Sequence, residues 1–238
     1  MSTFLQLAQK LRQECRIGTD GQPTTVTSQT GQLKRVCDWT IESWNDIQRR
    51  HQNWRWMRAP CTVNTVAEDD TYVYTDFTDS RSASAISRFS RWNPYDDQGC
   101  TAWKIYLQSA GVATEGWMYY MPLGDFRRLY KLGSPASGAP LHFTFDEDNY
   151  VLLGPKPSAV YVVTGSYQRG VQTLSADGTT PEMPSDYHDL IVYNALEKYG
   201  FSAAASESLA RARRENFRLF CQLEGNQLPP MYLPPPMA

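Results

Sequence analysis

The stretch Cys37–Arg58, CDWTIESWNDIQRRHQNWRWMR, decides how the first part of the chain folds. It holds four of the seven tryptophans, and in its first half apolar residues recur at steps of three and four. This spacing predicts a buried helix over about residues 31–52. Trp54 and Trp56 then stand two residues apart, which is strand spacing. We therefore expect Trp44, Trp54 and Trp56 to pack at a junction between a helix and a β-region, a structural role without catalytic chemistry.

The same helical spacing recurs near both ends of the chain. It predicts further helices over about residues 3–16, 186–200 and 202–224. Candidate caps are Ser2 or Thr3 and Ser185 at helix starts, and Gly200 and Gly225 at helix ends. The last helix has the apolar residues Leu209, Ala212, Phe217, Phe220 and Cys221. Because short amphipathic helices cannot bury their stripes alone, we expect the helices from both ends to pack together.

The middle of the chain reads mainly as strands. Alternation and turn residues predict strands within 61–75 and over 103–107, 115–120, 141–145, 150–153 and 159–168. DEDN at 146–149 is a plausible hairpin turn. A short helix is expected over 122–132, with Phe126, Leu129 and Tyr130 on one side. Residues 76–100 are rich in Ser, Asp and Arg and show no clear period.

The order of these elements predicts an α+β fold. We expect a four-helix bundle built from both termini, an inserted β-rich, sandwich-like domain and an extended Pro-rich C-terminal tail. The predicted domains are residues 1–58 with 183–226 for the bundle, 59–182 for the β-domain and 227–238 for the tail. The final segment, LPPMYLPPPMA, has five prolines in eleven residues, so it cannot form a helix.

Composition argues against several classes of function. The formal net charge is −2, with basic residues in excess over the first 60 positions and acidic residues in excess after them, so no region is basic enough to bind nucleic acid tightly. No apolar run approaches the roughly 18 residues of a membrane span, and the N-terminus lacks the pattern of a signal peptide. Five dispersed cysteines without a CxxC pair favour buried thiols over a metal site or disulfides. We expect no cofactor, no required metal and no membrane partner.

Sequences that could carry chemistry have simpler interpretations. SDYHD (185–189) contains Ser, His and Asp, but within one helical turn these cannot converge as a triad, and a helix start is favoured. DEDN lacks the ligand spacing of a calcium loop. The histidines His51, His142 and His188 are scattered, which argues against a zinc site. ARARRENFR (210–218) is more consistent with a solvated or subunit-facing surface than with a nucleic-acid groove.

Three segments resemble the tailed-bacteriophage head–tail adaptor family, also called connectors or tail accessory factors. They are LAQKLRQECRI with GQLKRVCDWTIESWNDIQRRHQNWRWM near the N-terminus, PLGDFRRLYKLG after an aromatic strand, and the closing helix pair that begins at MPSDYHDL. The resemblance implies a structural virion protein, not an enzyme, that forms a ring of usually twelve copies beneath the portal. That ring extends the DNA channel, lets DNA pass without sequence-specific binding, and offers a platform to tail or neck proteins. The implied location is the virion neck, after assembly in the host cytoplasm.

In relatives a C-terminal extension reaches the portal, and the Pro-rich tail is suited to that role. Prolines lower the entropy lost on binding, and the tail offers apolar anchors. The portal-binding residues implied in this way are Met231, Tyr232, Leu233, Pro234 and Pro235.

Two other classes of function stay open. The aromatic β-region could be a receptor- or carbohydrate-binding module of a phage tail, which would need an exposed aromatic platform. A hydrolase could use Asp96 and Asp97 with Asp76 or Asp79, which would need two carboxylates that converge in a cleft.

Overall fold

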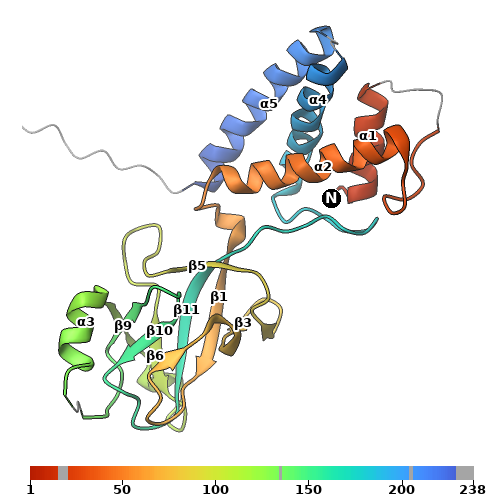
Figure 1. Cartoon of the computed structure of the whole chain (residues 1–238). Helices are drawn as coiled ribbons and strands as arrows, with labels where there is room; N and C mark the ends of the chain where they lie inside the picture. Colours follow the sequence, from red (N-terminus) through yellow and green to blue (C-terminus); the bar gives the residue numbers. More distant parts are fainter. Residues whose placement is uncertain (16–20, 134–135, 204–205, 229–238) are drawn as a thin grey trace, which may run out of the picture. The chain divides into compact units, whose positions relative to one another are not determined.

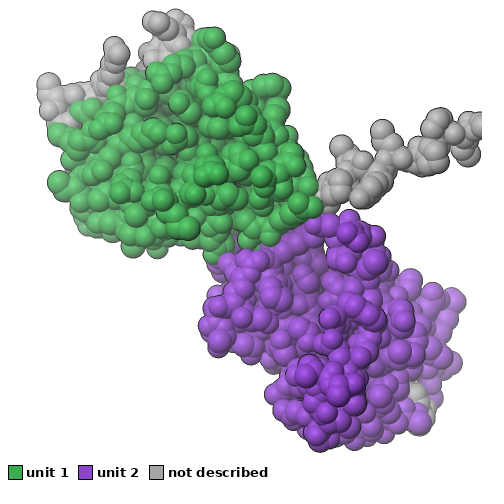
Figure 2. Space-filling model, turned by 180° about the vertical axis from the view of Figure 1, so that it is seen from behind, with its two compact units in different colours: residues 1–57, 171–238 green, residues 58–170 purple. Residues whose placement is uncertain are grey.

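The computed structural model describes residues 1–15, 21–133, 136–203 and 206–228. The chain divides into two compact units, which are coloured separately in Figure 2. The first unit is formed by Met1–Met57 with Val171–Ala238, and the second by Arg58–Gly170. Helices near both ends therefore belong to one unit, although the whole β-rich segment separates them in sequence.

Four helices pack together in the first unit (Figure 1). Helix α4 lies against each of the other three, and α1 also packs against α2. Their bounds are α1 Phe4–Cys15, α2 Gly31–Arg50, α4 Asp189–Ala203 and α5 Ser206–Gln227. This arrangement confirms the predicted α+β fold in which helices from both ends of the chain pack together and a β-region is inserted between them in the sequence. Of the predicted tail, Gln227 is the last residue of α5 and Leu228 packs against the helical core, while residues 229–238 lie outside the described residues.

Local sequence explains how the first two helices begin and end. The Thr3 hydroxyl accepts a hydrogen bond from the Gln6 N–H at 3.3 Å, while the Gln6 side-chain oxygen accepts one from the Thr3 N–H at 3.0 Å. This reciprocal pair caps α1, as predicted for Thr3. Helix α2 stops where His51 becomes extended, at φ −133° and ψ 138°.

The predicted strand spacing at Trp54 and Trp56 is wrong. Residues Arg55–Met57 form a 3-10 turn, η1, and the first strand begins only at Arg58. The turn brings the two indoles together, with ring centroids 4.2 Å apart in a stacked arrangement. Both indoles belong to the core of the helical unit. A tight turn, like a strand, can place side chains that are two residues apart on the same side of the backbone.

Three predicted helix boundaries are also wrong, and the first is Gly225, which lies inside α5 because that helix continues to Gln227. Gly200 lies inside α4, where an added Cβ would come within 2.9 Å of the Leu209 Cβ, so the glycine permits close approach of α5 and does not end the helix. Ser185 does not cap α4, because a 3-10 turn, η4 (Ser185–Tyr187), precedes it and Pro184 occupies the position before that turn.

The segment after residue 170 is attached to the helices by backbone hydrogen bonds. The Phe4 N–H donates to the Thr179 carbonyl at 2.8 Å. The Gln48 side chain accepts from the Gln172 N–H at 2.7 Å and donates to the Gln172 carbonyl at 3.0 Å. Leu174 is buried in the helical core. These contacts explain why this segment groups with the helices.

The second unit contains two β-sheets and one short helix, α3 (Leu123–Tyr130). One sheet has the order β4-β3-β1-β11-β6-β7, with β5 also paired to β11, and the other has the order β2-β10-β9-β8. The bounds are β1 Arg58–Asn64, β2 Thr71–Tyr72, β3 Thr78–Asp79, β4 Ser84–Ala85, β5 Phe89–Asn93, β6 Lys104–Leu107, β7 Gly116–Trp117, β8 Tyr119–Tyr120, β9 His142–Phe145, β10 Val151–Gly154 and β11 Tyr161–Arg169.

Strands β1 and β11 pair antiparallel from Arg58↔Gln168 to Asn64↔Val162, so the second unit starts and ends on adjacent strands. The predicted strands 103–107 and 159–168 and the hairpin around DEDN are confirmed as β6, β11 and β9–β10. The unassigned region 76–100 contains β3, β4 and β5.

Aromatic side chains from both sheets share one core. Trp103 is fully buried and stacks on Phe143 of the second sheet, with centroids 4.9 Å apart. The opposite side of the indole lies over Gly165, where an added Cβ would come within 2.7 Å of the ring. The glycine in β11 is therefore required by the neighbouring indole.

Candidate interaction surfaces

The His188 imidazole, a candidate catalytic group, is buried and ties two backbone segments together. Its Nδ1 accepts a hydrogen bond from the Ser2 N–H at 3.1 Å, and its Nε2 lies 3.1 Å from the Met183 carbonyl oxygen. Burial lowers the pKa of His188. Asp189 pairs instead with Lys10 at 2.6 Å. These contacts give SDYHD a role in fixing the start of α4.

The candidate carboxylates each have separate partners. Asp96 accepts hydrogen bonds from the Gln98 N–H at 2.8 Å and the Cys100 N–H at 2.9 Å, and Asp97 pairs with Arg58. Asp79 accepts a hydrogen bond from the Tyr167 hydroxyl at 2.9 Å. Burial alone would raise the pKa of Asp79, but the hydrogen bonds and nearby guanidinium groups hold it below its ordinary value. A general acid needs the opposite shift, so this arrangement does not support a hydrolase.

The expectation of buried thiols is met by Cys15, Cys37 and Cys61 but is wrong for Cys100 and Cys221, which are exposed. No group of three or more His, Cys, Asp or Glu side chains in the part of the chain that the structure describes could hold a metal ion. Burial raises the pKa of Cys15 to about 12 and that of Cys37 to about 11, so both stay protonated and unreactive at neutral pH. Within the described residues, no helix is long and apolar enough to cross a membrane.

The three predicted junction tryptophans all lie in the helical unit. Trp44 and Trp54 are fully buried, and the Trp54 indole N–H donates to the Ile47 carbonyl at 3.0 Å. Trp56 is buried beside Trp54. The predicted portal-binding residues Met231, Tyr232, Leu233, Pro234 and Pro235 lie outside the described residues.

Helix α5 presents an exposed face built around Phe217. This side chain is 73 % exposed, whereas the sequence pattern grouped it with the apolar residues of the helix. Ala212, Leu219 and Leu223 are buried and are spaced by seven and four residues, which is helical spacing. Phe217 does not fall on this spacing, and that is the signal that could have distinguished it from the buried positions. Cys221, one turn further along, is also exposed. We call the exposed side chains Ala210, Arg214, Phe217, Arg218 and Cys221 the α5 face.

Two arginines of the cluster at 210–218 are partly neutralised by carboxylates. Arg211 pairs with Glu14 of α1 at 3.3 Å, and Arg218 pairs with Glu215 at 2.8 Å. The pairing lowers the net positive charge that a phosphate backbone would meet. An exposed aromatic ring among arginines is instead typical of a protein-binding surface.

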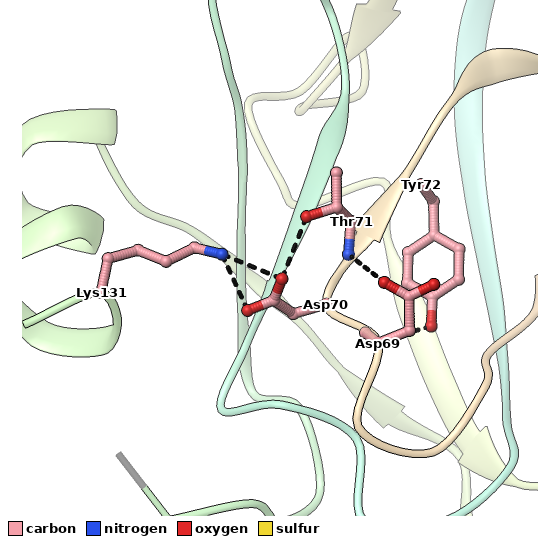
Figure 3. Close-up of polar contacts among 5 residues, drawn as sticks. All are labelled: Asp69, Asp70, Thr71, Tyr72 and Lys131. Carbon is pink, nitrogen blue, oxygen red and sulfur yellow. Dashed lines mark hydrogen bonds and ion pairs between the residues drawn. The ribbon is translucent and has the colours of Figure 1, made fainter. Parts of the chain in front are cut away.

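In the second unit, Lys131 anchors the end of α3 to the turn before β2 (Figure 3). Its ammonium group lies 2.9 Å and 2.8 Å from the two carboxylate oxygens of Asp70, which is only 8 % exposed. The Asp70 carboxylate also accepts a hydrogen bond from the Thr71 hydroxyl at 3.0 Å. The Tyr72 hydroxyl closes the same turn by donating to the Asp69 carbonyl at 2.8 Å. The position of α3 is therefore set by an ion pair whose carboxylate is buried and whose ammonium group comes from a partly exposed side chain.

The anchored helix projects a basic and apolar surface. Phe126 is buried beneath it, but Leu129 is 55 % exposed, which corrects the prediction that these two share an inner side. Leu132, just after the helix, is 77 % exposed. We call the exposed side chains Arg127, Arg128, Leu129 and Leu132 the α3 surface. It borders a hollow of about 510 Å³ that Thr71 and Leu152 also line.

A second hollow, of about 610 Å³, lies on the other side of β2. We call it the acidic hollow, and it is lined by Thr62, Val63, Asn64, Val66, Asp69, Tyr72, Asp76 and Thr78. Its lining contains two aspartates and no Lys or Arg. Val66 at its rim is 60 % exposed. The acidic hollow thus contains both negatively charged aspartates and an exposed valine side chain.

The profile of the SU10 adaptor protein family matches residues 2–224. The chain belongs to this family of phage head–tail adaptors. The family is one of structural proteins that bind other virion proteins, so the surfaces of this adaptor are the sites to examine. No curated protein matches the chain.

Proposed function

We propose that this adaptor forms a ring, of twelve copies as is usual in the family, beneath the portal, extends the DNA channel and provides the platform on which tail or neck proteins dock. The observation that carries the proposal is the α5 face. Phe217, with Ala210 and Cys221 beside it on the helix, gives α5 an exposed apolar strip, and an aromatic ring is an effective anchor when a partner covers it. The virion neck is the location that this role requires.

In the proposed ring, genomic DNA passes without sequence-specific binding. The ion pairs Arg211–Glu14 and Arg218–Glu215 support this part, because paired arginines release fewer counterions from DNA than free ones. The tail residues Met231, Tyr232 and Leu233, with Pro234 and Pro235, are proposed to bind the portal in extended conformation. The role of Trp44, Trp54 and Trp56 at the junction stays a prediction.

Mass measurement of the purified protein, alone and mixed with its portal, tests the proposal. The expected result is a discrete closed oligomer, in isolation or on the portal. Phe217→Ala should weaken assembly while leaving the fold intact, because the phenyl group of Phe217 is exposed to solvent in the isolated subunit. Tyr150→Ala, at an exposed aromatic of the other unit (37 % exposed), is the matched control. A protein that stays monomeric with and without the portal would contradict the proposed ring-shaped oligomer.

One observation supports the second candidate function, a receptor- or carbohydrate-binding module of a phage tail. Trp117 at the end of β7 and Tyr119 at the start of β8 are 51 % and 55 % exposed, while Met118 between them is buried. Such a pair could contact a sugar or receptor. The Lys104 ammonium, however, already lies 4.7 Å from the centre of the Trp117 ring. Glycan-array binding that is lost in Trp117→Ala would favour the tail-module alternative.

A further inference from the structure

We propose that the α3 surface of one copy inserts into the acidic hollow of a neighbouring copy, so that the β-units form a ring contact of their own. The inference rests on the proposed ring and names the surfaces that would join adjacent subunits. It uses two features of the second unit that no enzymatic or metal-binding role explains.

The charges of the two surfaces are complementary. The α3 surface carries Arg127, which also pairs with Glu147 at 2.8 Å, and Arg128, which lies 3.7 Å from Asp125 and has a side chain that is 85 % exposed. In the acidic hollow, one carboxylate oxygen of Asp69 accepts from the Thr71 N–H at 3.1 Å, and one of Asp76 accepts from the Val73 N–H at 2.8 Å. Each carboxylate keeps a second oxygen able to accept from an incoming guanidinium. Opposite charges steer encounter and set the register of a contact.

The shapes are complementary as well. Leu132 and Leu129 project from the end of a short, firmly anchored helix. The hollow has a volume of about 610 Å³, enough for one or two such side chains, and Val66 and Val63 supply apolar surface within it. A small apolar contact inside a charged rim is the usual arrangement of a specific protein interface.

The two surfaces face in different directions, as a ring requires. Thr71 and Tyr72 are successive residues of β2, so their side chains point to opposite sides of the strand. Thr71 lines the hollow beside α3, and Tyr72 lines the acidic hollow. Figure 1 likewise shows α3 and β3, which supplies Thr78 to the acidic hollow, at opposite sides of the second unit. A contact between unlike patches that point apart is head-to-tail, and it closes into a ring when the rotation permits.

Charge reversal in the full-length protein tests the contact. Arg128→Glu and Asp76→Lys should each raise the concentration needed for half-assembly by at least about tenfold, measured by analytical ultracentrifugation. The double variant Arg128→Glu with Asp76→Lys should restore assembly, because the pair is then reversed but still opposite. Circular dichroism checks that each variant is folded. Arg128→Gln, which removes charge without reversing it, should lie between wild type and Arg128→Glu.

A cysteine crosslink supplies a second readout. In a chain with Cys100→Ser and Cys221→Ser, which removes the exposed thiols, Leu132→Cys combined with Val66→Cys should give a ladder of covalent oligomers under mild oxidation. Either new cysteine alone should stop at dimers or stay monomeric. Assembly of wild type that no reversal weakens, or that the double reversal fails to restore, would overturn this contact and leave the ring intact. A wild-type chain that never assembles would overturn the ring as well.

Discussion

At the scale of single residues, the β-unit depends on a glycine that faces an indole. Gly165→Ala would drive a methyl group to 2.7 Å from the buried Trp103 ring, which stacks on Phe143 and cannot withdraw. We expect a loss of about 1–3 kcal/mol in the free energy of unfolding, measured by denaturant titration. Gly124→Ala, in α3 with open space around the new methyl group, is the control and should stabilise by up to about 1 kcal/mol. Equal effects at both sites would contradict the role of the indole.

The ion pair that holds α3 permits a second prediction at this scale. Lys131→Met should destabilise the β-unit by about 1–3 kcal/mol, because it leaves the Asp70 carboxylate buried without its cation. Adding Asp70→Asn should recover part of that loss, since the uncompensated charge is removed. Thermal unfolding of the two single variants and the double variant forms the cycle. Independent, additive losses would show that the pair does not anchor the helix.

His188 makes the stability of the helical unit depend on pH. Its folded pKa is lowered, so the unfolded chain binds the proton more readily, and the stability due to the neutral ring is present above about pH 6.5. It should be lost as pH falls from there toward the folded pKa. After correction for the slower intrinsic exchange at lower pH, the protection factors of α1 and α4 amides should therefore fall between about pH 7 and pH 5. In His188→Gln, which cannot take up the proton, that fall should be smaller.

At the scale of elements, the sequence predicted the helices well because their stripes repeat over several turns. It predicted β6, β11 and the hairpin for the same reason, since alternation and turn residues coincide there. It failed at Trp54 and Trp56, where a single step of two cannot distinguish a strand from a 3-10 turn. Strands such as β3 and β4, with two residues each, are too short to show any period.

The candidate surfaces were less predictable than the fold. The arginine cluster at 210–218 is visible in the sequence as a surface, but the exposure of Phe217 depends on which side of α5 meets α4. The acidic hollow is lined by residues of β1, β2 and β3. The local sequence pattern could not predict that these strands lie next to one another in the fold. Gly200 was interpreted as a helix end because glycine occurs both at helix ends and where two helices approach closely. Only the position of Leu209 shows that Gly200 has the second role.

At the scale of the whole molecule, the two units should differ in their ability to fold alone. A fragment of residues 58–170 contains both sheets and their complete aromatic core, so we expect it to fold. A fragment of residues 1–60 lacks α4, against which both α1 and α2 pack, and should be largely unfolded. Circular dichroism and amide spectra of the two fragments make the comparison. A helical, cooperatively melting 1–60 fragment would contradict it.

The pairing of β1 with β11 has a genetic consequence. Because Arg58 lies opposite Gln168, the polypeptide leaves the helices and returns to them at neighbouring points of one sheet. A recombination event with crossovers near positions 58 and 170 could therefore replace the intervening cassette without cutting any helix. The reading frame on either side would go on encoding the same helical unit.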